Sequence, residues 1–234
     1  MKSILLSHIG KRKINQDVIL VKNLNPDTYV YLIADGMGGY DNGEIAASIS
    51  IENIFSFLSD VNIMDEEKIQ KAINKANLAI RQFQEQNQSK LGATIGGVII
   101  SENVAKCFWV GDVKIMQFRK NKIIYESKSH NLINDIIESG SLSDSKNFSK
   151  YAHVVTRSIH GNIEKSKLSY KELDLLVDDI LIVCSDGVHN LIDSDSLEYM
   201  LSEKSDFDST IENINQKLIV EASDNASLIA ILYN

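Results

Sequence analysis

The residues best suited to chemistry in this sequence are aspartates at the ends of apolar runs. Four runs end at such an aspartate and a fifth aspartate precedes a run; the five are Asp17, Asp35, Asp112, Asp186 and Asp224. Each one alone is well explained as a turn residue that hydrogen-bonds to its own backbone. Strand ends on one edge of a core can nevertheless bring several carboxylates into one cleft, where they repel one another unless cations are present. Oxygen ligands favour hard cations, so we predict a site for Mg²⁺ or Mn²⁺ rather than zinc or copper.

The other reactive residue types support no competing chemistry. Neither Cys107 nor Cys184 is followed six positions later by the arginine that a cysteine-based phosphatase needs. The sequence contains neither a G-x-S-x-G elbow nor a G-x-x-x-x-G-K-[ST] loop. Its five histidines lack metal-ligand spacing, so we expect them at the surface or hydrogen-bonded in the core. Gly36, which follows Asp35, is different, because a residue without a side chain lets its backbone carbonyl approach an ion closely.

Composition and charge limit the partners of this protein. The net charge of −8 at pH 7 argues against nucleic acid and against anionic membrane surfaces. No apolar stretch is long enough for a secretory signal or a membrane span. Two cysteines within apolar runs are typical of buried thiols in a reducing compartment, so we expect a cytoplasmic protein. With 234 residues, no internal repeat and no low-complexity linker, we expect one domain over residues 1–234.

The elements that would position the aspartates come in alternating blocks. Strands are expected at 4–8, 18–22, 29–34, 94–100, 104–110, 114–119, 123–126, 179–184 and 226–232. Helices are expected at 44–58, 66–88, 132–139, 194–202 and 208–221. Tight polar connections between the middle strands favour an antiparallel meander. An α+β fold of two antiparallel sheets, packed together and covered by helices, accounts best for this order. The weakly patterned segment at about 131–161 is typical of a functional flap, and a mobile surface loop is an equal alternative.

Several short motifs resemble, in the same order, those of bacterial members of the PPM/PP2C family of metal-dependent protein phosphatases. Residues 10–17 (GKRKINQD) resemble the opening motif of the family, and residues 33–39 (IADGMGG) resemble the second. Further matches are GAT at 92–94, VGD at 110–112, VTR at 155–157 with Gly161, CSDG at 184–187 and SDN at 223–225. The resemblance spans residue 7 to about residue 231. It implies a PP2C-like β-sandwich of two antiparallel sheets flanked by pairs of α-helices.

The resemblance also implies roles for the residues that would hold two metal ions. Asp35 would bridge both ions, and Gly36 would give one of them its carbonyl. Asp186 and Asp224 would hold the first ion. Asp17 would help to hold the second, in part through water. The expected cofactors are therefore two Mn²⁺ or Mg²⁺ ions.

Asp112 and Arg12 complete the site that the resemblance implies. Asp112, with Asp186, would contribute to a weaker third metal site, although Ser129 stands where the family often carries an aspartate. Arg12 would grip the substrate phosphate, a task suited to the bidentate fork of a guanidinium. The chain departs from the family again at Lys114, where arginine is usual.

The activity implied by the resemblance is hydrolysis of phosphoserine and phosphothreonine on proteins. A hydroxide that bridges two metal ions would attack phosphorus in line, while Arg12 and the ions offset charge on the equatorial oxygens. Arg12, Asp35 and Asp186 are then the expected catalytic residues. A stand-alone bacterial phosphatase of this kind would oppose a serine/threonine kinase encoded elsewhere. The resemblance favours a monomer.

Two other functions remain open on the sequence alone. The chain could be a catalytically weak or dead family member that acts as a regulatory binding module, although Arg12 and four principal aspartates are retained. It could instead hydrolyse small phosphoesters, because specificity would reside in the segment at 131–161. Phosphopeptides assayed beside small phosphoesters separate the last alternative from a protein phosphatase.

Overall fold

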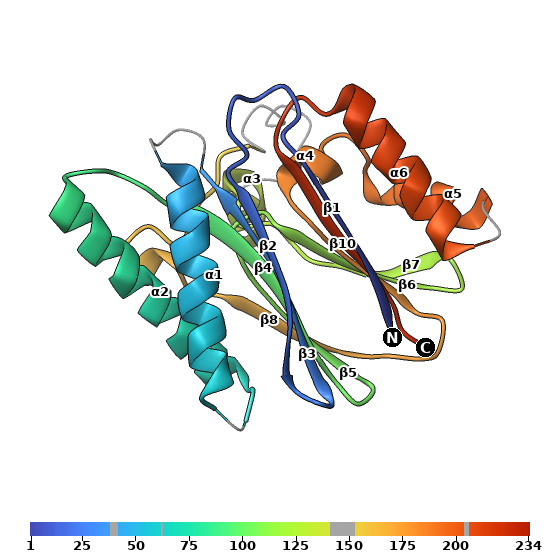
Figure 1. Cartoon of the computed structure of the whole chain (residues 1–234), viewed down its shortest axis with the longest axis horizontal. Helices are drawn as coiled ribbons and strands as arrows, with labels where there is room; N and C mark the ends of the chain where they lie inside the picture. The colour runs from blue at the N-terminus through green and yellow to red at the C-terminus, as the bar shows by residue number, and fades with distance from the viewer. Residues whose placement is uncertain (38–41, 62, 141–152, 204–205) are drawn as a thin grey trace.

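Two five-stranded antiparallel sheets lie at the centre of the computed structural model, which describes residues 1–37, 42–61, 63–140, 153–203 and 206–234 (Figure 1). The first sheet has the order β1 (Lys2–His8), β10 (Ala226–Leu232), β9 (Ile180–Cys184), β6 (Lys114–Arg119) and β7 (Lys122–Glu126). The second has the order β2 (Asp17–Asn25), β3 (Thr28–Gly36), β4 (Ala93–Ser101), β5 (Val104–Val110) and β8 (Ser169–Asp174). Neighbouring strands pair antiparallel throughout both sheets. The predicted α+β fold of two antiparallel sheets is confirmed.

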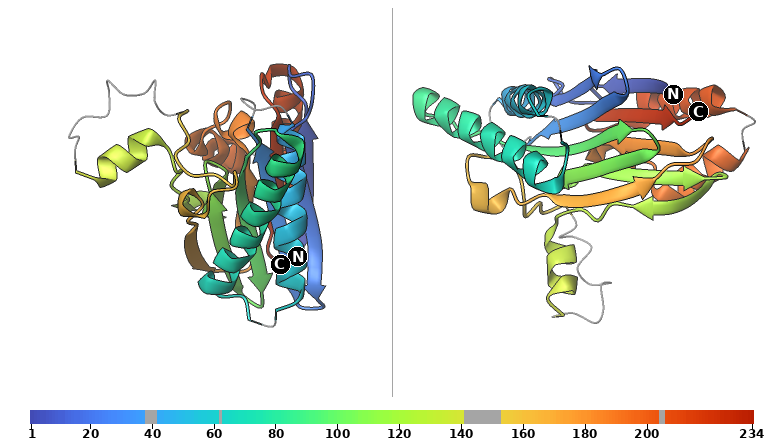
Figure 2. Two further views of the ribbon diagram at one scale, coloured as in Figure 1. Left: turned by 90° about the vertical axis from the view of Figure 1, so that its left-hand side faces the viewer. Right: turned by 90° about the horizontal axis from the view of Figure 1, so that it is seen from below.

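Helices cover the outer face of each sheet (Figures 1 and 2). The second sheet carries α1 (Gly43–Ser59) and α2 (Glu66–Asn87), and the first carries α5 (Ser194–Glu203) and α6 (Phe207–Glu221). Both α2 and α6 begin at an aspartate cap: Asp65 accepts from Lys68 N at 2.8 Å, and Asp206 accepts from Ser209 N at 2.8 Å. Such caps satisfy amide groups that have no partner within the helix.

The strand β3 illustrates why the central runs are apolar without a break. Val30, Leu32 and Ala34 pack against the helices α1 and α2, whereas Tyr31 and Ile33 pack between the two sheets. Side chains alternate along a strand, so a strand that is covered on both faces needs apolar residues at every position. Full burial of each large aliphatic side chain contributes roughly 1.5–3 kcal/mol relative to exposure. This continuous burial holds the strand ends, and the residues on them, in fixed positions.

Besides the short 3₁₀ helix η2 (Ile163–Lys165), two elements were not predicted from the sequence. The first is β8, whose residues Ser169–Asp174 (SYKELD) are mostly polar because it is an edge strand that pairs on one side with β5. The second is the short helix α4 (Asp186–His189), which follows β9 directly. The strand β8 was missed because its partner β5 lies far away in the sequence, and α4 was missed because four residues are too few to show a helical period.

The predicted flap at about 131–161 lies partly outside the described residues, at 141–152. Its described part contains α3 (Leu132–Glu138), which projects away from the sandwich (Figure 2). The segment after the gap is fixed to the start of α3, because Leu132 N donates to Val154 O at 2.9 Å and Asn131 pairs with Val155. A short 3₁₀ helix, η2 (Ile163–Lys165), follows. None of the helices within the described ranges combines the length and the apolarity needed to cross a membrane.

Candidate metal centre

Strand pairing brings the predicted aspartates to one end of the sandwich. Asp17 opens β2 and pairs with Asp35, which lies near the end of β3. Asp112 follows β5, Asp186 follows β9, and Asp224 precedes β10. Because neighbouring strands are antiparallel, the start of one strand and the end of the next meet at the same edge. Residues that are far apart in the sequence therefore share one small region.

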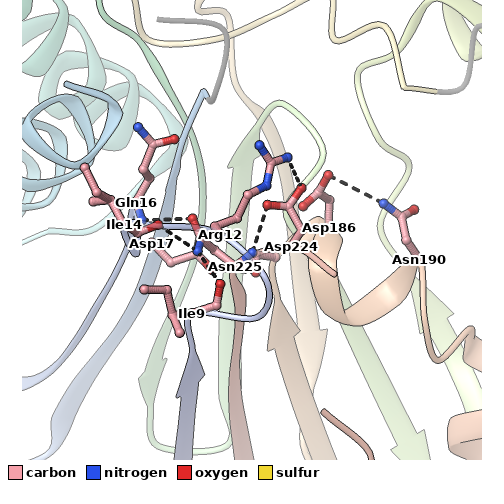
Figure 3. A network of polar contacts seen from close by, with 10 residues as sticks. Ile9, Arg12, Ile14, Gln16, Asp17, Asp186, Asn190, Asp224 and Asn225 are labelled. Atoms are coloured by element: carbon pink, nitrogen blue, oxygen red, sulfur yellow. Dashed lines mark hydrogen bonds and ion pairs between the residues drawn. The ribbon is translucent and has the colours of Figure 1, made fainter. Parts of the chain in front are cut away.

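A cavity of about 590 Å³ opens at this end of the molecule. It is lined by Arg12, Gln16, Asp35, Gly36, Met37, Thr94, Asp112, His153, Val155, Asp186, Asp224 and Asn225. All the predicted site residues except Asp17 belong to this lining. Asp17 lies buried behind the wall, with 8% of its surface exposed. Figure 3 shows the side chains of Arg12, Asp224 and Asp186 next to one another.

The carboxylate of Asp17 is only half satisfied. Its Oδ2 accepts a hydrogen bond from Ser185 Oγ at 2.8 Å, whereas its buried Oδ1 has no hydrogen-bond partner among the described residues. Burial, together with the smaller effect of the charges of Asp186 and Asp224, raises the pKa of Asp17 to about 6. A buried carboxylate oxygen without a donor is costly, and a cation or its bound water would satisfy it.

The carboxylates around the cavity perturb one another. Burial raises the pKa of Asp35 well above its ordinary value, and the charges of Asp17 and Asp186 add to the effect. Burial likewise raises the pKa of Asp186 to about 6, with the charge of Asp112 contributing. The pKa of Asp112 is also raised, again chiefly by burial. Like charges gathered in a partly desolvated site repel, and bound cations would relieve that repulsion.

Arg12 forms the one ion pair that joins this carboxylate cluster to a side-chain cation among the described residues. Its Nη2 donates to Asp224 Oδ2 at 2.7 Å (Figure 3). The hydrogen bond to Asp224 and its negative charge raise the pKa of Arg12. Half of the arginine side chain remains exposed, at 51%. The guanidinium therefore stands at the open rim of the cavity and not in its floor.

Asn225 holds the loop that carries Arg12. Its side-chain amide donates to Ile9 O at 2.9 Å and to Ile14 O at 3.0 Å, and its Oδ1 accepts from Gln16 N at 3.0 Å (Figure 3). These bonds tie both ends of the connection between β1 and β2 to the start of β10. Asn225 stands within a recognised motif, so the sequence contained a signal for it, but its role as the loop anchor required the structure.

Gly36 lies where no side chain would fit. A Cβ at this position would lie 2.3 Å from the carbonyl of Gly43, at the start of α1. The adjacent residues 38–41, which include the end of the predicted IADGMGG motif, lie outside the described residues. The close approach to α1 explains the glycine, and Gly36 is one of the residues that line the cavity.

The donor set fits hard divalent cations. No three carboxylate, imidazole or thiolate groups among the described residues converge closely enough to enclose an ion by themselves. Magnesium-type ions do not require such convergence, because they keep several waters and bind through one or two carboxylates. The unpartnered Asp17 Oδ1, the raised aspartate pKa values and the carbonyl of Gly36 all suit ions that accept oxygen ligands.

Three histidines lie around the site, although their spacing in the sequence did not predict metal binding or any other role there. His153 lines the cavity, and His130 and His189 lie behind its wall. Burial lowers the pKa of His130 to about 4, with the charge of Arg157 adding to the effect. Burial and the charge of Lys114 lower the pKa of His189 to about 4. Both rings are therefore neutral near neutral pH. The expectation that the histidines would be surface or hydrogen-bonded core residues describes these two well, but it gave no hint of their place beside Asp112.

The fold and this site together define a class: an antiparallel sandwich with a carboxylate-lined cavity at one end, of the kind found in metal-dependent phosphatases. The family model for protein phosphatase 2C matches residues 6–232. The chain belongs to the protein phosphatase 2C family, and its enzyme class is that of the protein serine/threonine phosphatases.

Related proteins match this chain along nearly its whole length. A putative protein phosphatase 2C-type of Streptococcus pyogenes is 26% identical, covering 100% of this chain and 98% of its own. A putative protein phosphatase of Mycoplasma genitalium is 23% identical, covering 95% and 90%. The solved serine/threonine phosphatase of S. agalactiae superposes with a TM-score of 0.85 at 23% identity, covering 100% and 99%. The catalytic domain of the phosphatase PstP, solved with two manganese ions, has a TM-score of 0.76 at 20% identity, covering 100% and 98%.

Proposed function

We propose that this chain hydrolyses phosphoserine and phosphothreonine esters on proteins with the help of two divalent cations, Mn²⁺ or Mg²⁺. The observation that carries the proposal is the single cavity that joins Asp35, Asp112, Asp186 and Asp224 with the guanidinium of Arg12. A phosphate dianion needs positive charge around it, and this cavity supplies anionic groups to hold cations and one arginine at the rim.

The aspartates would hold the ions. Asp35, Asp186 and Asp224, with the carbonyl of Gly36, are the donors that line the cavity, and Asp17 would act from behind its wall. When bound, the cations would lower the pKa of a coordinated water and offset charge on the phosphate oxygens. Asp112 lies beside Asp186 and would contribute to a weaker third site. Each of these assignments extends the donor geometry to ions of the kind found in the manganese complex of PstP.

Arg12 would bind the phosphate. Its guanidinium is anchored on one side by Asp224 and exposed on the other, so free N–H groups face the opening. A planar guanidinium can donate two parallel hydrogen bonds to a phosphate and thereby fix its orientation. The loop anchored by Asn225 keeps this donor at the rim.

We further propose that residues 1–234 form a single phosphatase domain and that the protein acts as a monomer. It would oppose a serine/threonine kinase. Its substrates would be phosphorylated proteins, as expected for a protein phosphatase family. The two free, buried cysteines, Cys107 and Cys184, suit a reducing, cytoplasmic location.

A substrate panel tests the protein phosphatase against a small-molecule phosphohydrolase. Phosphoserine and phosphothreonine peptides are compared with sugar phosphates and nucleotides at equal concentration in Mn²⁺. The proposal expects a kcat/KM for the peptides that exceeds that for every small phosphoester. A higher kcat/KM for one small phosphoester would assign the site to that class instead.

A further inference from the structure

The turn between β5 and β6 brings Asp112 to the cavity and is tightly constrained. Gly111 has a φ of +106°, and a Cβ there would lie 2.3 Å from Cγ2 of Thr94. Any other residue would be strained by this backbone conformation and would also collide with β4. The main-chain amide and carbonyl groups of such a turn need fixed partners, because buried polar groups are rarely left unpaired.

His130 satisfies both main-chain groups of Gly111. Its Nδ1 accepts the amide of Gly111 at 3.0 Å, and its own amide donates to Gly111 O at 2.8 Å. Since Nδ1 accepts, the proton of the neutral ring lies on Nε2, which donates to Ser169 Oγ at 2.8 Å. The ring also stacks on Trp109, with centroids 6.2 Å apart. His130 is 5% exposed, so its orientation is fixed from several sides.

His189 holds the next residue of the turn. Its Nε2 lies 3.0 Å from the backbone carbonyl of Asp112, so the nitrogen must carry a proton and donate it. His189 ends α4, and Asp186 begins it. One short helix therefore carries the Asp186 carboxylate and also binds the main chain of Asp112. The two aspartates are close enough for their charges to interact.

We propose that His130 and His189 are positioning residues that set the Asp112 carboxylate opposite Asp186 for cation binding, an inference that rests on the proposed function. Neither ring touches the reacting atoms. Each acts on the main chain of Gly111 and Asp112, and a rotation of this turn changes the spacing of the two aspartates. Groups that orient metal ligands in this way are typically worth about 10–100-fold in metal affinity.

Amide substitutions distinguish the two ring positions. The side-chain amide of asparagine lies near the place of Nδ1, and that of glutamine reaches the place of Nε2. His130→Asn therefore keeps an acceptor for the Gly111 amide, and His130→Gln does not. His189→Gln keeps a donor for the Asp112 carbonyl, and His189→Asn does not. The asparagine and glutamine variants of each histidine differ by one methylene group. A general loss of packing would therefore favour the same amide at both histidines, whereas the proposal predicts that asparagine is better at 130 and glutamine at 189.

The experiment is a Mn²⁺ titration of the full chain, with free Mn²⁺ followed by its electron paramagnetic resonance signal. For the most weakly bound ion, we expect His189→Asn to lose about 10-fold or more in affinity, whereas His189→Gln stays close to wild type. At His130 the order is reversed, with the asparagine variant close to wild type. Equal affinities for the two variants of a histidine would overturn the proposal for that histidine. His8→Asn, which removes a ring that contacts Asn215 on α6, is the control and should match wild type.

A double-substitution cycle tests whether the effect passes through Asp112. In an Asp112→Asn background, His189→Asn should cause no further loss of Mn²⁺ affinity, because the carboxylate that it positions is gone. A full additional loss would show that His189 acts elsewhere and would overturn the proposal. Failure of the proposed function is read separately, as absence of phosphoester hydrolysis by the wild-type chain, whereas the Mn²⁺ affinities of the histidine variants decide the positioning role.

Discussion

At the scale of single residues, the ion pair between Arg12 and Asp224 connects the proposed phosphate-binding residue to a proposed metal ligand. Both partners are partly exposed, at 51% and 35%, so the pair contributes little to stability. Its importance lies in position: Asp224 is a proposed metal ligand, and Arg12 is the proposed phosphate donor. A cation held by Asp224 would compete with the guanidinium for this carboxylate and would leave Arg12 available for phosphate.

Removal of the Arg12 side chain should reduce catalysis without unfolding the protein. We expect Arg12→Ala to lower kcat by about 10²–10³-fold, the usual cost of removing a donor that stabilises a transition state. Arg12→Lys should recover only part of this loss, because an ammonium group cannot donate two parallel hydrogen bonds. The measurement is steady-state hydrolysis of p-nitrophenyl phosphate at saturating Mn²⁺.

Lys11→Ala is the matched control for Arg12. Lys11 is the neighbouring cation, lies on the same exposed loop, does not line the cavity and has no ion pair in the described part of the chain. It should retain a kcat close to wild type. Equal losses of kcat in the Arg12→Ala and Lys11→Ala variants would show that Arg12 contributes only its positive charge and no specific hydrogen bonds to phosphate.

At the scale of elements, Ser185 joins the two sheets beneath the cavity. Its hydroxyl donates to Asp17 Oδ2 on β2 and accepts from Ser227 N on β10 at 2.9 Å. The residue caps neither end of α4 with its side chain, although it precedes that helix. Its hydroxyl is used instead to orient a proposed metal ligand.

Ser185→Ala should therefore weaken both stability and metal binding. The loss of one hydroxyl leaves two buried groups without a partner, which costs about 1–3 kcal/mol of unfolding free energy. Urea unfolding in a chelator measures this cost, and a Mn²⁺ titration measures the second effect. Ser202→Ala, which removes an exposed hydroxyl on α5, should change neither quantity. A Ser185→Ala protein with wild-type stability and Mn²⁺ affinity would contradict this account.

A second polar connection closes the opposite end of the sandwich. Asp179 is buried and accepts hydrogen bonds from Arg119, Gln117 and the amide of Leu176. Burial alone would raise its pKa, but these bonds outweigh burial, and the pKa is lowered. The charged Asp179 carboxylate therefore stabilises the folded protein fully above the pKa of the unfolded state, which is about 4. This contribution is lost as pH falls through the lower pKa of the folded state.

Asp179→Asn should consequently destabilise the protein in a pH-dependent manner. At pH 7 we expect a loss of about 2 kcal/mol, as for hydrogen bonds to a charged group. The difference from wild type should shrink as pH falls from 5 towards 3, because the carboxylate of the unfolded wild type becomes protonated there before that of the folded protein. Urea unfolding of both proteins across this range provides the measurement. A difference that is constant with pH would show that the carboxylate charge does not contribute.

At the scale of the whole molecule, the apolar patterns and motifs predicted most strands and the main helices, and six of the seven predicted site residues line the cavity. Unbroken apolar runs predicted strands such as β3 well, because both faces of such a strand are covered. The polar edge strand β8 was not predicted because the strand it pairs with, β5, lies about 60–70 residues earlier in the sequence. Its identity depends on tertiary pairing and not on local composition.

The details of the site needed the structure for similar reasons. Whether Asp17 faces the cavity or lies behind its wall depends on strand register, which the motif does not encode. The contacts of His130 and His189 with the turn at Gly111 join segments that are distant in the sequence. Single histidines without metal-ligand spacing give no sequence signal for such a role.

The central claim is that metal held by the aspartate cluster performs phosphoester hydrolysis. The most direct test is hydrolysis of p-nitrophenyl phosphate and a phosphothreonine peptide by chelator-stripped protein, with and without Mn²⁺, for wild type and Asp186→Ala. The account predicts turnover of both substrates by wild type only when Mn²⁺ is added, and its loss in a folded Asp186→Ala protein. Turnover without metal, or wild-type rates in the variant, would contradict the account. Absence of turnover in a folded wild type that binds Mn²⁺ would contradict it as well and would favour a regulatory binding module.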